Sequence, residues 1–265
     1  MSLAHCHRIG KHFVFAAQRA EPERLLSCTL GAGSRCSLCA PPDLIACRFT
    51  LTRTLLVAAY TLYCFTQSGN AYKAALMLKL CGADWEPRFV DYFHGETRSP
   101  EFRAINEMGE VPILEHEGRR MSQSGVILDY LAERLGQYGG HNAEERRDIL
   151  RWILFDNHKL TSYTATLRFM LTFQKSAETP VTAFLRGRSM GALGVLDQHL
   201  AEHAFAIGER PTIADFSMCG YLYFGDELGV DMSAFPHVGR WLDAIAALPG
   251  WVHPYKLMPG YPLQE

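Results

Sequence analysis

Ser68 stands where a short predicted strand gives way to a helix, a position that suits the stabilisation of an anion. Residues 61–65 alternate as in a half-buried strand, and Ser68-Gly69-Asn70 interrupts the alternation. An apolar stripe of helical period follows and ends before Gly82. The beginning of a helix offers free N–H groups and a partial positive charge. A hydroxyl there can stabilise a thiolate, although a serine in this place can also serve only as a helix cap.

The stabilisation that such a thiolate needs is within reach of one hydroxyl and one helix end. A free thiol has a pKa of about 8.5, so little of it is ionised at neutral pH. Stabilising the anion by about 2 kcal/mol would make it the major form. Two rivals for Ser68 lie in the preceding strand: Tyr63, whose place inside the strand favours packing, and Cys64.

Two further polar sites follow along the chain. Val111-Pro112 precedes an apolar run, and proline cannot donate a hydrogen bond to a sheet. A cis bond before Pro112 would leave the backbone of Val111 free for a ligand, whereas an edge-strand turn is the alternative. Gln123 and Ser124 open the next helix, with Ser124 predicted as its N-cap and Gly136 at its end. Their amide, hydroxyl and N–H groups predict a clamp for an amine and a carboxylate.

After Gly139-Gly140 the sequence pattern is wholly helical. The predicted helices are one long helix from Glu144 to about Phe173, one from Thr179-Pro180 to about His203, one opened by the Thr212–Asp215 capping box, and one bracketed by Pro236 and Pro249. Because Asp215 caps a buried helix, its removal should damage folding and not chemistry.

The order and spacing of these motifs resemble the glutathione transferase family over roughly residues 59–254. The shared motifs are S-G-N-A-Y-K from Ser68, M-G-E-V-P from Met108, Q-S-G-V-I from Gln123 and P-T-I-A-D-F from Pro211. The resemblance is to the cytosolic, bacterial-type members that use a serine. It implies an α/β thioredoxin-like N-terminal domain over 59–138 and an all-α helical domain over 142–265. It also implies a cytoplasmic homodimer that uses glutathione as a cosubstrate, without a metal or prosthetic group.

The resemblance also implies roles for individual residues. Ser68 would hydrogen-bond the glutathione sulfur, with Asn70 as the second polar contact of the reacting thiol. The glutathione-binding set would be Arg98 on the glycyl carboxylate, Val111 with a cis Pro112 on the cysteinyl backbone, and Gln123 and Ser124 on the γ-glutamyl group.

Two departures from the family pattern predict a modest affinity for glutathione. Gln123 stands where the family often has Glu, so an ion pair with the γ-glutamyl ammonium becomes a hydrogen bond. Glu110 stands where some members carry Lys, which removes a cation near the carboxylates of the tripeptide.

The long helix is predicted to form the wall of the pocket for an electrophile, the reaction partner of a thiolate. The candidate wall residues are Trp152, Phe155, His158, Tyr163 and Phe169. Aromatic residues at helical spacing are also typical of a plain core. His158 lies within a polar stretch of the helix, yet a lone histidine is also common in purely structural roles.

Residues 1–58 do not fit this pattern and are predicted to be an irregular or disordered extension. They hold five of the eight cysteines, and Cys36 and Cys39 have the spacing of metal ligands without a second such pair.

The whole chain has 265 residues, 48% of them hydrophobic, which is enough for two compact units. A net charge of −2 gives no support for nucleic-acid binding. No apolar run approaches the ~20 residues of a membrane span.

The predicted function is a glutathione transferase that directs the thiolate at a small electrophilic substrate, as in detoxification. Two alternatives remain open. One is glutathione-dependent reduction of disulfides or peroxides, and the other is a non-catalytic module that binds glutathione or supports assembly.

Overall fold

The computed structural model describes residues 6–9, 12–15, 26–28 and 58–261. The chain divides into two units, Met1–Leu55 and Leu56–Glu265. In the first unit, strands β1 (Cys6–Ile9), β2 (His12–Phe15) and β3 (Leu26–Cys28) form an antiparallel sheet. These short strands were not predicted, because the sequence there has no sustained alternation. The rest of the predicted extension, including Cys36 and Cys39, lies outside the described residues.

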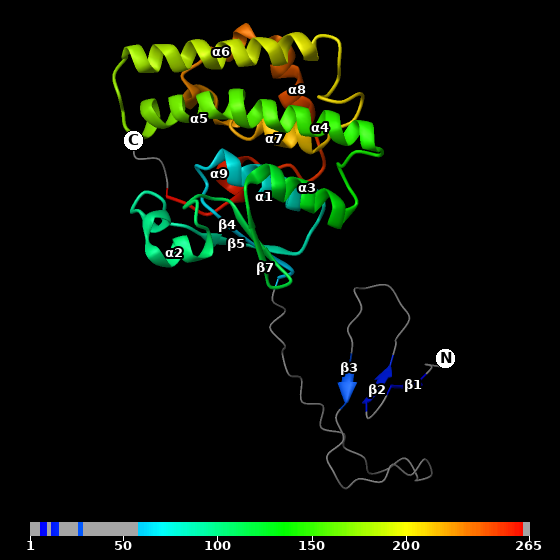
Figure 1. The fold of residues 1–265 in the computed structure, drawn as a ribbon. Coiled ribbons are helices and arrows are strands. Elements are labelled where there is room, and N and C mark those ends of the chain that lie inside the picture. The colour runs from blue at the N-terminus through cyan, green and yellow to red at the C-terminus, as the bar shows by residue number, and fades with distance from the viewer. Residues whose placement is uncertain (1–5, 10–11, 16–25, 29–57, 262–265) are drawn as a thin grey trace, which may run out of the picture. The chain divides into compact units, whose positions relative to one another are not determined.

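The second unit begins with a four-stranded sheet in the order β5-β4-β6-β7 (Figure 1). Its strands are β4 (Tyr60–Cys64), β5 (Trp85–Phe89), β6 (Ile113–His116) and β7 (Arg119–Ser122). β4 pairs in parallel with β5 and antiparallel with β6. The helices of this domain are α1 (Gly69–Leu80), the 3₁₀ turn η1 (Glu96–Arg98), α2 (Pro100–Ile105) and α3 (Ser124–Leu135). The predicted thioredoxin-like domain is confirmed.

β4 is covered on both faces, whereas the sequence pattern predicted a half-buried strand. Leu62 and Cys64 point into the main core together with residues of α1 and α3. Tyr63 points to the other face, where it packs with Ile113 of β6 and Phe102 of α2. A central strand between two helical layers is apolar on both sides, so its alternation is weak.

The helical domain runs from α4 to α9. Its elements are α4 (Ala143–Phe155), the π segment η2 (Asp156–Leu160), α5 (Thr161–Arg168), the π segment η3 (Phe169–Phe173), α6 (Pro180–Leu200), α7 (Ile213–Cys219), the 3₁₀ turns η4 (Leu222–Leu228) and η5 (Met232–Ala234), α8 (Pro236–Ala246) and α9 (Pro254–Leu257). The predicted long helix is confirmed in extent, but the π segment η2 interrupts it and the π segment η3 forms its last turn. In the part of the chain that the structure describes, every helix is too short or too polar to cross a membrane.

A buried ion pair joins the two domains. The side chains of Lys73 in α1 and Asp156 in η2 are fully buried, and Lys73 Nζ lies 2.7 Å from Asp156 Oδ2. Lys73 also donates to the Thr161 hydroxyl at 3.1 Å. The hydroxyls of Thr161 and Ser217 donate to Asp156 at 2.7 and 2.6 Å, which satisfies both carboxylate oxygens. Helices α1, η2, α5 and α7 are therefore held at one polar point inside the core.

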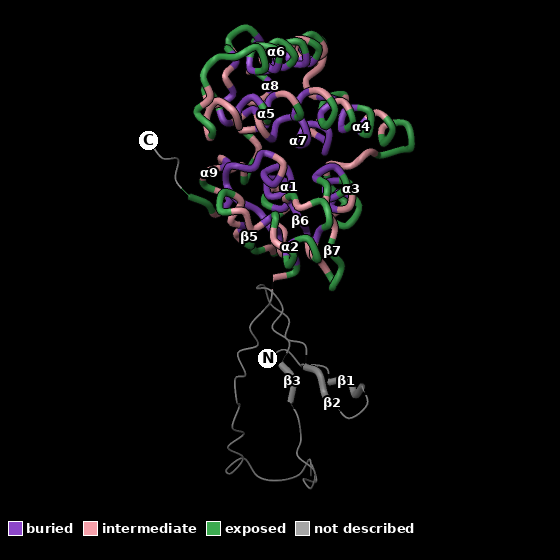
Figure 2. Tube along the Cα trace, turned by 60° about the vertical axis from the view of Figure 1, so that its left-hand side comes forward, coloured by how far each residue is buried: buried purple, intermediate pink, exposed green. Residues whose placement is uncertain are grey.

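Two glycines let α1 and α7 approach each other. A Cβ atom at Gly220 would lie 2.6 Å from Lys73 Cγ and 2.7 Å from the Gly69 carbonyl oxygen. A Cβ atom at Gly69 would lie 2.4 Å from the ring of Tyr221. Figure 2 shows α1 and α7 as mostly buried, in contrast to the exposed outer parts of α4 and α6. The glycine after Ser68 is thus required by packing between the domains.

The predicted capping box at the start of α7 is confirmed. Asp215 is fully buried, and its Oδ2 accepts the Thr212 backbone N–H at 2.7 Å. Its Oδ1 accepts the Ala206 N–H at 2.8 Å and the Trp241 indole N–H at 2.9 Å. This carboxylate therefore joins three segments of the helical domain, well apart from any solvent-accessible site.

We expect Lys73→Met to lower the free energy of unfolding by about 3–5 kcal/mol, because it leaves the Asp156 carboxylate buried without its cation. Urea unfolding followed by circular dichroism measures the change. Arg120→Met is the matched control, since the Arg120–Glu115 pair is largely exposed and such pairs contribute less than about 1 kcal/mol. Equal effects of the two substitutions would contradict the importance given to the buried pair.

Candidate functional site

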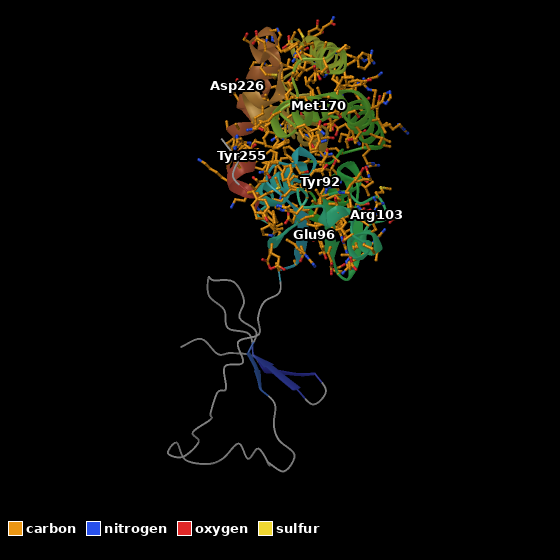
Figure 3. The ribbon with its side chains drawn as sticks, turned by 90° about the vertical axis from the view of Figure 1, so that its left-hand side faces the viewer. Tyr92, Glu96, Arg103, Met170, Asp226 and Tyr255 are labelled. Carbon is orange, nitrogen blue, oxygen red and sulfur yellow. The ribbon has the colours of Figure 1, made fainter. Side chains whose placement is uncertain are left out.

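A cavity of about 830 Å³ lies at the N-terminal end of α1. From the thioredoxin-like domain, its lining includes Ser68, Asn70, Arg98 and Val111. From the helical domain, it is lined by the C-terminal part of the long helix and by the residue after Gly220, Tyr221. Figure 3 labels Tyr92, which lines the cavity from the thioredoxin-like domain, and Met170 in the helical domain above it. A cavity of this volume is within the usual range for small-molecule sites.

Ser68 is the N-cap of α1 and also faces the cavity. Its backbone is extended (φ −86°, ψ 107°), and its Oγ accepts the Ala71 N–H at 3.1 Å. The residue is 5% exposed. Among the described residues, no acceptor is recorded for its hydroxyl hydrogen. The two interpretations of this serine are therefore compatible, because capping uses a lone pair and leaves the hydrogen for a ligand.

Asn70 supplies an acceptor that has no partner within the described residues. Its Oδ1 is buried, and no hydrogen bond to it is found. Asn70 lines the same cavity as Ser68. A buried polar atom left unpaired costs about 1–3 kcal/mol, so a donor on a bound molecule would offset that cost.

Val111 also presents unpaired backbone to the cavity. The Val111–Pro112 bond is cis, which confirms the prediction. Val111 lines the cavity, and within the described part of the chain no hydrogen bond of its N–H or C=O is recorded. Arg98, at the end of η1, lines the same cavity with an exposed side chain.

Gln123 and Ser124 lie beside the cavity and do not line it. Gln123, not Ser124, is the N-cap of α3, so the predicted cap is displaced by one residue. The Gln123 amide donates to Glu110 Oε2 at 3.2 Å, and Glu110 lines the Ser68 cavity. Gln123 has φ +67°, a conformation that side-chain-bearing residues rarely adopt. Such backbone is common at ligand clamps.

The four aromatic and histidine residues predicted for the electrophile pocket do not line this cavity. Trp152 is buried and lies against His199, and Phe155 packs on Trp152. His158 is exposed, and Tyr163 lies beneath a cationic side chain on α6. The predicted fifth residue, Phe169, does line it. The part of the long helix that lines the cavity lies between residues 165 and 174, after the π segment η2, whereas Trp152 and Phe155 precede that segment.

An aromatic wall spans both domains. Phe65 stacks on Tyr92 with ring centroids 4.9 Å apart, and Tyr92 meets Phe169 at 6.4 Å. Phe93 packs on Phe173 at 5.1 Å. All five rings line the cavity. Tyr92 and Phe93 belong to a loop after β5, where no periodic pattern could have pointed to them.

Arg168 is a functional candidate that the sequence analysis missed. It lines the cavity, and only 2% of its side chain is exposed. Its Nη1 donates at 2.7 Å to the carbonyl of Gln67, the residue before Ser68. The available signal was a lone cation in the apolar run T-L-R-F-M-L, since buried arginines are rare unless paired.

The C-terminal segment supports the loop that carries Ser68. Thr66 donates through its N–H to the Pro259 carbonyl at 2.8 Å and through its hydroxyl to the Pro254 carbonyl at 2.9 Å. The Gln67 side chain donates to the Tyr261 carbonyl at 2.5 Å. The segment that precedes Ser68 is therefore fixed from behind by residues almost two hundred positions away in the chain.

The two rivals of Ser68 have other environments. Tyr63 points to the α2 side of the sheet, where its hydroxyl accepts from Arg88 at 3.1 Å and donates to Glu115 at 3.2 Å. Cys64 is buried, and burial raises the pKa of its thiol to about 12. A thiol with that pKa is protonated at neutral pH and is a poor nucleophile.

Comparisons with known proteins agree with this architecture. Residues 58–133 match the family described as glutathione S-transferase, N-terminal domain, and residues 160–249 match its C-terminal domain. A maleylacetoacetate isomerase from Pseudomonas aeruginosa is 29% identical over 204 residues, which is 73% of this chain and 95% of that protein.

Two solved structures are similar to this chain over about three quarters of its length. A glutathione S-transferase from Pseudomonas fluorescens is 31% identical with a TM-score of 0.71, and the match covers 74% of this chain and 99% of that one. A glutathione transferase from Burkholderia graminis, solved with two glutathione molecules bound per subunit, is 25% identical with a TM-score of 0.66, covering 75% and 88%. This chain belongs to the glutathione S-transferase family.

Proposed function

We propose that this protein is a glutathione transferase in which Ser68 donates a hydrogen bond to the glutathione thiolate. The observation that carries the proposal is a serine that caps α1 through its lone pair and keeps its hydrogen for a ligand in the cavity. The N-terminal end of α1 adds a partial positive charge at the same place. Asn70 is the second polar contact, and its Oδ1 would accept an N–H of the bound glutathione.

Glutathione would lie along the thioredoxin-like side of the cavity. The cysteinyl unit pairs with the free backbone of Val111, and Arg98 binds the glycyl carboxylate. Gln123 and Ser124 bind the γ-glutamyl group at the rim, where Gln123 is already fixed by Glu110. Because Gln123 carries no charge, we expect it to bind the γ-glutamyl ammonium more weakly than a glutamate would.

The electrophile would bind against the aromatic wall formed by Phe65, Tyr92, Phe93, Phe169 and Phe173. The thiolate attacks the electrophilic carbon, a carbon–sulfur bond forms, and the leaving group departs with its electron pair. The protein positions both reactants and keeps the sulfur ionised, and its own side chains form no covalent bond.

A second candidate function is the glutathione-dependent reduction of a disulfide or peroxide. The volume of the cavity and the two glutathione molecules bound in the Burkholderia graminis relative support it. In that reaction two thiols are oxidised to one disulfide, and the substrate takes up the two electrons. A product assay separates the two functions, because a transferase yields a thioether and a reductase yields oxidised glutathione.

The partner that we propose for the groove between α3 and α4 is a second copy of the chain. Val126, Leu150 and Leu154 line it with exposed fractions of 57%, 53% and 59%. Asp129 and Arg146 also line it, which would let the two copies exchange ion pairs across a twofold axis.

The buried free thiols at positions 64 and 219 suit a reducing compartment, which supports a cytoplasmic location.

We expect Ser68→Ala to lower turnover about ten- to a thousandfold, as for the loss of one donor to an anion. An ultraviolet titration of bound glutathione should show a thiol pKa below the free value in the wild type and a higher one in the variant. Ser99→Ala is the matched control, because Ser99 caps α2 through a similar bond and does not line the cavity. Unchanged turnover in Ser68→Ala would move the donor role to another group.

We expect Leu150→Glu with Leu154→Glu to convert a dimer into a monomer, because both charges would be buried at the proposed interface. Sedimentation velocity measures the change in mass. Phe184→Glu serves as the control, since Phe184 is 62% exposed on α6, away from the groove. A wild-type protein that sediments as a monomer would refute the proposed contact.

A further inference from the structure

The guanidinium of Arg168 lies next to the reacting end of the cavity and is held there rigidly. It donates to the carbonyl of Gln67, directly before Ser68, at 2.7 Å. Nε and Nη2 donate to Glu227 Oε2 at 2.9 and 2.6 Å, and Nη2 also reaches the Tyr255 hydroxyl at 3.0 Å. Its Cζ lies 3.6 Å from the centroid of the Phe224 ring. A side chain fixed by four hydrogen bonds and an aromatic face is preorganised for recognition.

One N–H of the Arg168 guanidinium is not used by these four hydrogen bonds. A guanidinium has five N–H donors, and the four hydrogen bonds above use one on Nε, one on Nη1 and two on Nη2. Among the described residues, no partner is recorded for the second Nη1 hydrogen. Arg168 lines the cavity, whereas its counter-ion Glu227 is not among the described lining residues. A ligand in the cavity therefore meets the cation and not the carboxylate.

The charges around the cavity leave Arg168 unassigned once glutathione is bound. The charged lining residues are Arg98, Arg168 and Glu110. In the proposed complex the glycyl carboxylate of glutathione binds Arg98. The Glu110 carboxylate accepts a hydrogen bond from the Gln123 amide at the rim of the cavity. The remaining cation lies on the helical side, close to the aromatic rings of Phe169 and Phe173.

We propose that Arg168 is a specificity-determining residue and that the preferred electrophiles are aromatic compounds bearing a carboxylate. The ring of the substrate packs on the aromatic wall while its carboxylate accepts the free Nη1 hydrogen. This inference rests on the proposed transferase function. A charge-assisted hydrogen bond of this kind corresponds to a preference of about ten- to a hundredfold over a neutral analogue.

The test compares 4-chloro-3,5-dinitrobenzoate with 4-chloro-3,5-dinitrobenzamide as electrophiles. In both, the thiolate attacks the carbon that bears chlorine, the carbon–sulfur bond forms, and chloride leaves with the electron pair. After correction for the uncatalysed rates, we expect kcat/KM for the acid to exceed that for the amide at least about tenfold, mainly through KM. Equal values in the wild type would overturn the inference.

Variants attribute the preference to the arginine. Arg168→Met combined with Glu227→Gln removes both charges of the pair and should abolish the preference. Glu227→Gln alone leaves the cation without its counter-ion and should increase it. Arg188→Met is the control, because Arg188 lies over Tyr163 and does not line the cavity. An acid preference that survives the double variant would overturn the role of Arg168.

A binding measurement separates this inference from the proposed function. Calorimetry with unreactive 3,5-dinitrobenzoate and 3,5-dinitrobenzamide, in the presence of glutathione, needs no turnover. Tighter binding of the acid that depends on Arg168, without thioether formation, would support the anion site and overturn the transferase proposal. Thioether formation with equal binding of the two compounds would support the transferase and overturn the anion site.

Discussion

The ion pair between Lys73 and Asp156 is the constraint on which the rest of the structure depends. A lysine and an aspartate without solvent contact must stay paired, because either charge alone would be strongly destabilising in the core. The pair fixes α1 of the thioredoxin-like domain against η2 of the helical domain. Ser68 lies at the beginning of α1, so the same contact fixes its distance from the opposite wall of the cavity. The π segment that carries Asp156 also sets the phase of the helix that supplies this wall.

The site is accordingly a property of the junction between the domains. One side supplies polar groups with unused hydrogen-bonding capacity at Ser68, Asn70 and Val111. The other side supplies the guanidinium of Arg168 and two of the five rings of the aromatic wall, Phe169 and Phe173. Arg168 and the C-terminal segment both bond to the loop before Ser68, so the helical domain also positions the polar side. This division suits a reaction between one constant, polar cosubstrate and one variable, largely apolar partner.

Local signals predicted the elements and the polar half of the site. Three of these signals depend only on residues that are close together in the sequence: the strand before Ser68, the glycine at position 136 and the Thr212–Asp215 capping box. The structure places all three as expected. The cis bond before Pro112 is equally local. The thioredoxin-like fold built from these elements then brings four predicted residues to one cavity, Ser68, Asn70, Arg98 and Val111. Their roles toward glutathione stay predictions, tested by the experiments above.

The sequence alone determined the family, the order of the main elements after residue 58 and the caps at Ser68 and Thr212, whereas the cap predicted at Ser124 lies one residue earlier, at Gln123. These depend on backbone hydrogen bonds and hydrophobic period, which short stretches of sequence encode. Only the tertiary structure decided the electrophile side. Of the five predicted wall residues only Phe169 lines the cavity, because a 3.6-residue pattern shows which face of a helix is apolar and does not show which turn of it borders a cavity. Arg168 became a candidate only when folding brought it to Gln67 and Glu227, because contacts across such separations depend on packing and not on local propensity.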